Sequence, residues 1–139
     1  MFNWKKKTSI FIGRFQPFHE GHKRIFLKTL KNSGQVAILV MDSHKVGIKN
    51  PLPFKNVKKK INARLKLYKK KYVIIKIPVV NELVYGRKVG YKIKKIRNKK
   101  TEIISSTKIR KKAKKIFGER FVEHLKNANI SDLKILEAD

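Results

Sequence analysis

The 139-residue sequence has no cysteine, only 9 acidic residues and no long apolar run. Without cysteine there can be no disulfide, no thiolate metal ligand and no cysteine nucleophile. The longest apolar run, residues 36–41, is far shorter than the roughly 20 residues that span a bilayer. The basic start of the chain lacks the apolar stretch and the cleavage site of a signal peptide. We therefore expect a cytoplasmic protein that does not bind a membrane.

Lysine and arginine number 37, which gives a formal net charge of +28. One explanation is nucleic-acid binding, because a basic surface gains affinity by releasing counterions from phosphates. The other is a compositional bias that places lysine on solvated faces. We favour the second, because the charge is mostly lysine and is spread along the whole chain. In either case a positive field attracts anionic substrates such as nucleotides.

Short apolar runs alternate with segments of helical period, which predicts a parallel sheet flanked by helices. We expect strands at residues 9–12, 36–41, 72–77, 83–85 and 101–104. We expect a helix over residues 20–31, a second one capped by Asn56, and a third capped by Ser106 or Thr107. The third helix turns Ile109, Ala113, Ile116 and Phe117 inward and ends at Gly118. The fold predicted is a single α/β domain over residues 1–139, a Rossmann-like, doubly wound parallel sheet of about five strands.

The loop after the first strand, residues 13–22, reads Gly-Arg-Phe-Gln-Pro-Phe-His-Glu-Gly-His. Ligands of open parallel sheets bind at the carboxyl ends of the strands, and the start of the next helix favours anions there. Gly13 lets the backbone approach a ligand, and Gly21 leaves space between His19 and His22. The two imidazoles flank the first helical turn, where they can donate to a polyphosphate. We expect no zinc site, because no third ligand cluster accompanies them.

A second motif, residues 104–110, reads Ile-Ser-Ser-Thr-Lys-Ile-Arg. A predicted strand ends here in small hydroxyl residues that cap a helix, so that hydroxyls and free N–H groups can bind phosphate oxygens. Arg110 follows one turn later, where its guanidinium can reach the same phosphates in a bidentate fork. This motif therefore predicts a second half of one phosphate site.

The two motifs together resemble the His-x-Gly-His and Ile-Ser-Ser-Thr-x-Ile-Arg signatures of the nucleotidyltransferase superfamily. The first one is especially similar to nicotinamide mononucleotide adenylyltransferases of the archaeal type, and cytidylyltransferase-like proteins share the scaffold. The resemblance runs from the first strand through the helix after Arg110. The chain is shorter than is typical of those adenylyltransferases, and it has no paired carboxylates for acid–base work or a metal cage.

The resemblance implies a role for each matching residue. His19, His22 and Arg110 would be catalytic, with His22 stabilising charge at the α-phosphate. Nucleotide contacts are expected from Gly13, Arg14, Phe15, Gln16, Phe18, Gly21, Ser105, Ser106 and Thr107. Weaker likenesses suggest a phosphate contact for Lys49 and an acceptor or nucleotide contact for Arg87. Asp42, at the end of the second strand, is positioned for acceptor contact, although it could as easily cap a turn. No residue is expected to bind a metal directly; Mg²⁺ would arrive with the nucleoside triphosphate and take most of its other ligands from water.

These features favour transfer of a nucleoside monophosphate from ATP onto nicotinamide mononucleotide, with release of pyrophosphate. An enzyme alternative is cytidylyl transfer onto a small phosphate such as glycerol 3-phosphate. An alternative of another class is a basic nucleic-acid-binding module on the same fold, which we do not favour because no basic strip is interleaved with aromatic residues. A third alternative is a nucleotide sensor that binds nucleotide without catalysis. Homo-oligomers are compatible with the sequence.

Overall fold

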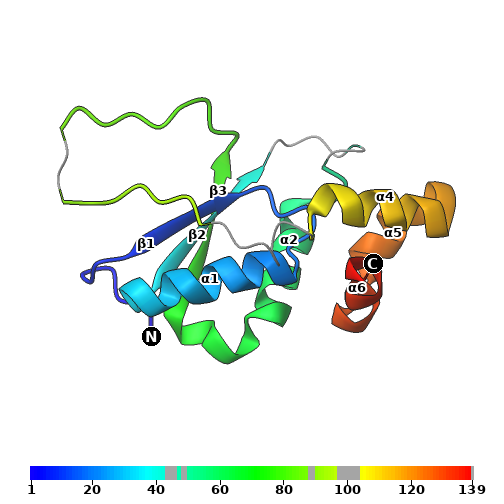
Figure 1. Cartoon of the computed structure of the whole chain (residues 1–139), viewed down its shortest axis with the longest axis horizontal. Helices are drawn as coiled ribbons and strands as arrows, with labels where there is room; N and C mark the ends of the chain where they lie inside the picture. The colour runs from blue at the N-terminus through cyan, green and yellow to red at the C-terminus, as the bar shows by residue number, and fades with distance from the viewer. Residues whose placement is uncertain (43–46, 48–49, 88–89, 97–103, 139) are drawn as a thin grey trace.

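The computed structural model describes residues 1–42, 47, 50–87, 90–96 and 104–138 (Figure 1). The chain first alternates between strands and helices. These are β1 (Ser9–Gly13), α1 (Glu20–Ser33), β2 (Val36–Asp42), α2 (Phe54–Arg64), the 3-10 helix η1 (Lys66–Lys71) and β3 (Tyr72–Pro78). The later described part is helical, with α4 (Ser106–Phe117), the 3-10 helix η2 (Gly118–Arg120), α5 (Phe121–Asn127) and α6 (Ile130–Glu137).

The described strands form a parallel sheet in the order β1-β2-β3. Ser9 aligns with Val36 of β2, which in turn aligns with Tyr72 of β3. The central strand carries the continuous apolar run, and its Val36, Ile38 and Val40 are fully buried. This burial is what a strand flanked on both sides requires. The first three predicted strands are confirmed, and so is the helix that ends before Gly34, which adopts the left-handed conformation at φ 80°.

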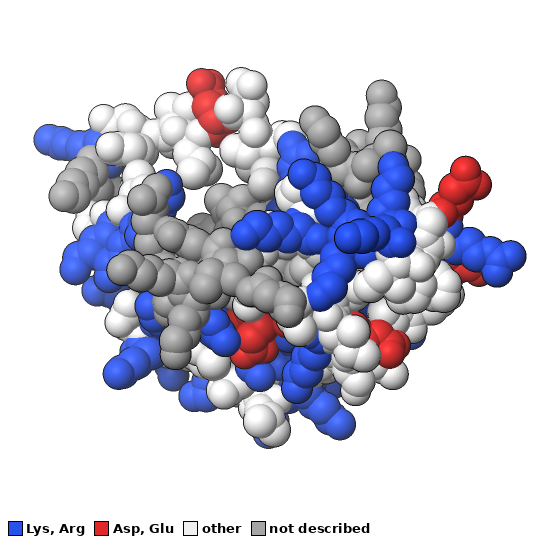
Figure 2. All heavy atoms as spheres, turned by 45° about the vertical axis from the view of Figure 1, so that its right-hand side comes forward, with Lys and Arg blue, Asp and Glu red and all other residues white. Residues whose placement is uncertain are grey.

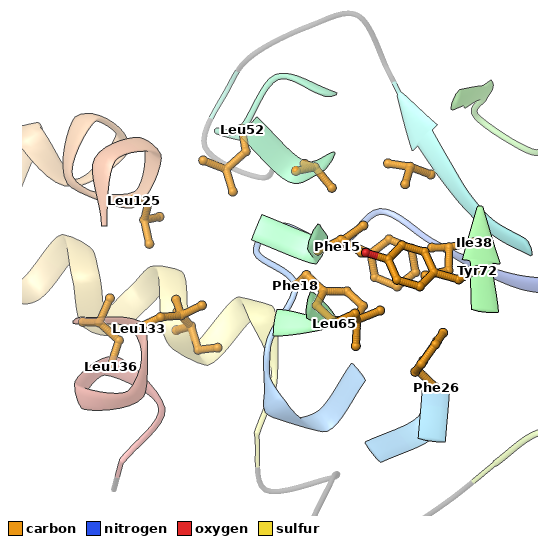
Figure 3. Close-up of a cluster of buried hydrophobic side chains, with 14 of the residues drawn as sticks. Phe15, Phe18, Phe26, Ile38, Leu52, Leu65, Tyr72, Leu125, Leu133 and Leu136 are labelled. Atoms are coloured by element: carbon orange, nitrogen blue, oxygen red, sulfur yellow. The ribbon is translucent and has the colours of Figure 1, made fainter. Parts of the chain in front are cut away.

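The main core lies between the sheet and the helices α1 and α2. Phe26 of α1 packs edge-to-face on Tyr72 of β3, with the ring centroids 5.7 Å apart. Leu65, just after α2, is fully buried in the same cluster. Figure 3 shows these side chains gathered beside Ile38, together with two phenylalanines of the loop after β1. The core therefore fixes that loop as well as the helices.

The C-terminal helices extend this core away from the sheet. Ile109 and Ala113 of α4 and Leu125 of α5 are buried, as are Leu133 and Leu136 of α6. Figure 3 shows Leu125, Leu133 and Leu136 between these helices. The side chains of Ser105 and Asn129 cap α4 and α6, each accepting a main-chain N–H three residues on. Among the described residues, no helix is long and apolar enough to cross a membrane.

The prediction of about five strands is not confirmed. Residues 83–85 are not a strand, and Leu83 and Val84 are 70% and 80% exposed. A three-residue apolar run cannot become a strand without a neighbour that satisfies its backbone groups. Of the fifth predicted strand, residues 101–103 lie outside the described residues, and Ile104 is not in a strand. The order of the described strands contains no reversal of the kind that a doubly wound sheet has at its switch point.

Three details of the predicted helices also differ. The N-cap residue of α4 is Ser105 and not Ser106 or Thr107, because Ser105 has the extended backbone of a cap and its side chain accepts the main-chain N–H of Lys108. The helix expected after Asn56 begins at Phe54, with Pro53 as the N-cap residue, because the fixed φ of proline already suits a helix start. Ile116 was expected to face inward but is 53% exposed. Gly118 does end α4, with a positive φ of 61° that favours glycine.

Candidate functional site

The two sequence motifs meet in the folded chain. Ser106 Oγ, at the start of α4, donates to the carbonyl oxygen of Pro17 at 2.9 Å. One turn later, Arg110 Nη1 donates to the carbonyl oxygen of Gln16 at 2.5 Å. Both acceptors belong to the loop that follows β1, about 90 residues earlier in the chain. The start of α4 therefore contacts the loop of residues 13–22, which we call the histidine loop, as the sequence predicted.

The glycine at the end of β1 makes room for an aromatic ring. A Cβ atom on Gly13 would lie 2.7 Å from the ring of Phe15, which is closer than such atoms pack. Phe15 has a positive φ of 53°, a conformation that L side chains rarely adopt. Its ring is buried and packs edge-to-face on Phe11 and Phe18. Gly13 thus shapes the loop through Phe15, and the aromatic cluster supports the histidines beside it.

His19 and His22 cap α1 with their own side chains. His19 Nδ1 accepts the main-chain N–H of Gly21 at 3.0 Å, and His22 Nδ1 accepts the main-chain N–H of His19 at 3.1 Å. The two imidazole rings stack with centroids 3.8 Å apart. Phe18 stacks on His22 at 5.3 Å. The rings are thereby fixed in position before any ligand binds.

The capping bonds also fix where each imidazole carries its proton. A neutral imidazole whose Nδ1 accepts a hydrogen bond is protonated at Nε2. Burial, and secondarily the charge of Arg64, lower the pKa of His19 to about 4. Burial, His19 and Arg64, in that order, lower the pKa of His22 well below its ordinary value. Each histidine therefore offers one neutral Nε2–H donor.

Arg110 lies partly buried between α4 and the histidine loop, and burial lowers its pKa from the ordinary value. Its Nη2 lies 3.5 Å from the hydroxyl oxygen of Thr107, one turn earlier. The guanidinium is thus oriented from both sides, by the loop carbonyl and by the α4 hydroxyl. The site combines two imidazole N–H donors, a guanidinium and the hydroxyl-rich start of a helix, a set that suits phosphate oxygens.

A comparison with models of protein families finds a match for the part of the chain that contains the histidine loop. Residues 10–62 match the model of the cytidylyltransferase-like family. This part of the chain is similar to the cytidylyltransferase-like nucleotidyltransferases. The matched region includes β1, the histidine loop, α1, β2 and most of α2, whereas the α4 motif lies beyond it.

Two solved structures are similar to part of the chain. Both are of a bifunctional NMN adenylyltransferase/ADP ribose pyrophosphatase from Francisella tularensis, one of them complexed with AMP and Mn ion. Each is 35% identical and covers 52% of this chain with a TM-score of 0.49. The chain in turn covers 23% of the complexed protein and 22% of the other. It therefore spans less than a quarter of the length of these proteins.

Several of the residues predicted to contact nucleotide have structural partners. Gln16, predicted to bind nucleotide, is buried, and its amide pairs with both main-chain groups of Leu52, at 2.8 Å each. Leu52 precedes α2, so this pair fastens the chain before α2 to the histidine loop. Phe18 and Gly21 are also buried, whereas Arg14 is exposed. Ser105 caps α4, its side-chain oxygen accepting the main-chain N–H of Lys108 at 3.1 Å.

Three further residues were predicted to contact the acceptor or a phosphate: Asp42, Lys49 and Arg87. No contact described in the structure joins them to His19 or His22. Asp42, at the end of β2, pairs with Lys76 of β3 at 3.5 Å. Arg87 is exposed in the segment after β3. Lys49 lies outside the described residues. The proposed roles of Lys49 and Arg87 rest on the sequence resemblance, and that of Asp42 rests on its position at the end of β2.

A buried charge cluster beside the histidines escaped the sequence analysis. The side chain of Arg64, at the end of α2, is only 2% exposed and bonds to Glu20 of α1 at 3.0 Å and to Glu137 of α6. Glu137 also accepts the first main-chain N–H of α1, from Glu20, at 3.3 Å. The cluster ties the C-terminal helix to the start of the histidine helix. Its one sequence signal is that Arg64 follows Val57 and Ile61 on the inner face of α2.

Proposed function

We propose that this chain transfers a nucleoside monophosphate from a nucleoside triphosphate to a small phosphate monoester and releases pyrophosphate. ATP is the preferred donor and nicotinamide mononucleotide the preferred acceptor, because the motif from Gly13 to His22 is most similar to adenylyltransferases of that specificity. One observation carries the proposal. The loop that holds the two imidazole donors also receives the hydroxyl and guanidinium groups of α4 through Ser106 and Arg110.

The reaction needs no catalytic base. A phosphate oxygen of the acceptor attacks the α-phosphorus of the triphosphate, and the bond from that phosphorus to the oxygen bridging to the β-phosphate breaks. A phosphate monoester has a second pKa of about 6, so its oxygen is already ionised at neutral pH. The protein has to position the two anions and stabilise the charge that grows on the α-phosphate and the leaving pyrophosphate. The described residues supply donors for that purpose.

Each donor has an assigned place in this scheme. His22 and His19 present Nε2–H groups to the triphosphate, with His22 at the α-phosphate. Being neutral, they donate hydrogen bonds without the cost of holding a buried charge before substrate arrives. Ser106, Thr107 and Arg110 hold the β- and γ-phosphates at the start of α4.

The residues present fit a metal that is bound mainly by the substrate. Among the described residues no group of three histidine, aspartate or glutamate side chains is arranged to hold a metal ion. Two carboxylates at the start of α1, those of Glu20 and Glu137, are already paired with Arg64. Mg²⁺ would be carried by the triphosphate, whose negative charge it offsets, with water completing its ligand shell.

The decisive test measures pyrophosphate release for ATP, CTP, GTP and UTP, each combined with nicotinamide mononucleotide, glycerol 3-phosphate or a control without acceptor. We expect release with ATP and nicotinamide mononucleotide that stops when His22 is changed to alanine. Activity confined to CTP and glycerol 3-phosphate would overturn the donor and acceptor that we prefer and leave nucleotidyl transfer intact. Nucleotide binding without turnover for every pair would indicate a sensor and overturn the enzyme proposal.

A further inference from the structure

A groove of about 660 Å³ runs along the side of α4 that faces away from the histidine loop. One wall consists of α4 side chains from Ser105 and Lys108 to Ile116. The other wall is the end of α6, with Leu136, Ala138 and Glu137, whose carboxylate is paired with Arg64. The groove begins at Ser105, the residue that caps α4, and leads away from the candidate nucleotidyl site. Nothing in the proposed transfer reaction uses it.

The wall formed by α4 is strongly basic. Lys108, Lys111, Lys112 and Lys115 recur at helical spacing along one side of the helix. Successive turns place such side chains about 4.5 to 6 Å apart along the axis. The helix itself contains no acidic residue. Figure 2, which brings the C-terminal helices forward, shows basic side chains gathered over this part of the molecule.

One of these lysines builds the groove. Lys112 Nζ donates to the carbonyl oxygens of Ile135 and Ala138, at the end of α6. That contact holds the second wall in place and satisfies carbonyls that a helix end leaves without partners. Lys111 and Lys115 are exposed on the rim. The rim therefore presents its charge to solvent above an apolar floor that contains Ile109 and Leu136.

A second cavity of about 280 Å³ continues the groove, because Ile116 and Leu136 line both. At this end the rings of Phe117 and His124 stack with centroids 4.0 Å apart and nearly parallel planes. His124 belongs to α5 and is exposed, so the pair comes from two different helices. The fold thus places a basic strip of α4 next to an aromatic pair that is formed between α4 and α5.

We propose that this groove binds a single-stranded nucleic acid, with backbone phosphates on Lys108, Lys111 and Lys115 and a base against the His124 ring. Basic side chains that track a phosphate backbone, beside an aromatic surface on which a base stacks, are the usual elements of such sites. A duplex keeps its bases paired and hidden from the ring. An acidic peptide offers the lysines carboxylates but nothing planar for the stacked pair. The high charge of the chain, +28, adds attraction for a polyanion.

The test measures fluorescence anisotropy of a labelled 12-nucleotide single strand at several salt concentrations. The variant Lys111→Glu/Lys115→Glu is compared with Lys69→Glu/Lys71→Glu, which makes the same charge change on exposed residues of η1. Losing two phosphate contacts should lower the slope of log affinity against log salt by about 1.4 in the groove variant only. An equal loss of slope in both variants would show diffuse attraction by the whole charge and overturn the proposal.

A second arm examines the aromatic end. Removing a stacked base contact costs 1 to 3 kcal/mol, so His124→Ala should weaken single-strand binding about tenfold at a salt concentration where charge is screened. A duplex of equal length should bind more weakly than the single strand. Binding of the duplex with equal affinity, or equal competition by an acidic peptide such as poly-glutamate, would overturn the proposal. Nucleotidyl transfer does not depend on these residues, so failure here leaves the proposed function standing.

Discussion

His19 and His22 are joined by a hydrogen bond from the main-chain N–H of His19 to Nδ1 of His22, 3.1 Å long. The His19 imidazole caps the same helix through the N–H of Gly21. Each ring therefore uses one nitrogen to build the start of α1 and keeps the other, protonated, for a ligand. A substitution at either position changes both the helix cap and the proposed phosphate site, so the two roles have to be separated by the choice of variant.

His19→Asn separates them. Asparagine is a good N-cap residue and can accept the N–H of Gly21 in place of Nδ1, but it has no group at the position of Nε2. We expect the thermal midpoint to stay within a few degrees of the parent while kcat for nucleotidyl transfer falls about 100-fold or more, as for the loss of one charge-stabilising donor. His19→Ala should lose both stability and activity. Full activity in His19→Asn would contradict the donor role.

Stability should also depend on pH through the buried imidazoles. The pKa of His19 is about 4 in the folded protein, below its ordinary 6.5, so between these values only the unfolded chain binds the proton. The free energy of unfolding therefore falls as the pH is lowered from 6.5 toward 4, by about 1.4 kcal/mol per pH unit from His19 alone. His22, with its pKa lowered too, adds to the fall. Above pH 6.5 the contribution is fully present.

Urea unfolding of the parent and of His19→Asn between pH 7.5 and 5 measures this effect. The variant should show the shallower decline with falling pH, because one of the two titrating imidazoles is gone. Parallel declines in the two proteins would mean that His19 titrates normally.

Much of the site follows from local sequence. Two local patterns predicted loops that meet at one edge of the sheet. One is Gly13 at the end of an apolar run, and the other is the set of hydroxyl residues before the helix that contains Arg110. The two motifs do meet, through Ser106 and Pro17, although the strand predicted directly before α4 is not confirmed in the described residues. These parts depend on neighbours in the chain, which periodicity and turn chemistry describe well.

The rest depends on partners far away in the sequence. Glu137 meets Arg64 across 73 residues, and the inner-face position of Arg64 on α2 does not identify this partner. Gln16 reads as a ligand-binding residue in its motif, but its amide is engaged by Leu52, 36 residues later. Residues 83–85 have the composition of a strand and lack a partner strand where the structure describes them. Pairing and burial of this kind are tertiary properties, which override local preference.

Arg64→Met tests the buried cluster. The change removes the guanidinium that lies between Glu20 and Glu137, so that both carboxylates lose their ion pair at the start of α1. Breaking a buried pair in this way costs about 3 to 5 kcal/mol, which urea unfolding can measure. The control Lys76→Met breaks the pair with Asp42, where the lysine side chain is 48% exposed, and should cost less than about 1 kcal/mol. Similar losses in both variants would argue against a special role for the Arg64 cluster.

Gly13→Ala tests the fit between β1 and the aromatic cluster. The new methyl group would lie 2.7 Å from the Phe15 ring, so the ring or the strand has to move. Overpacking of this kind costs about 1 to 3 kcal/mol of unfolding free energy. Gly86→Ala is the matched control, since a Cβ there has no neighbour within 4 Å, and it should change stability by no more than about 0.5 kcal/mol. If the clash is the cause, Phe15→Leu combined with Gly13→Ala should cost less than the sum of the two single changes, because a smaller side chain leaves space for the methyl group.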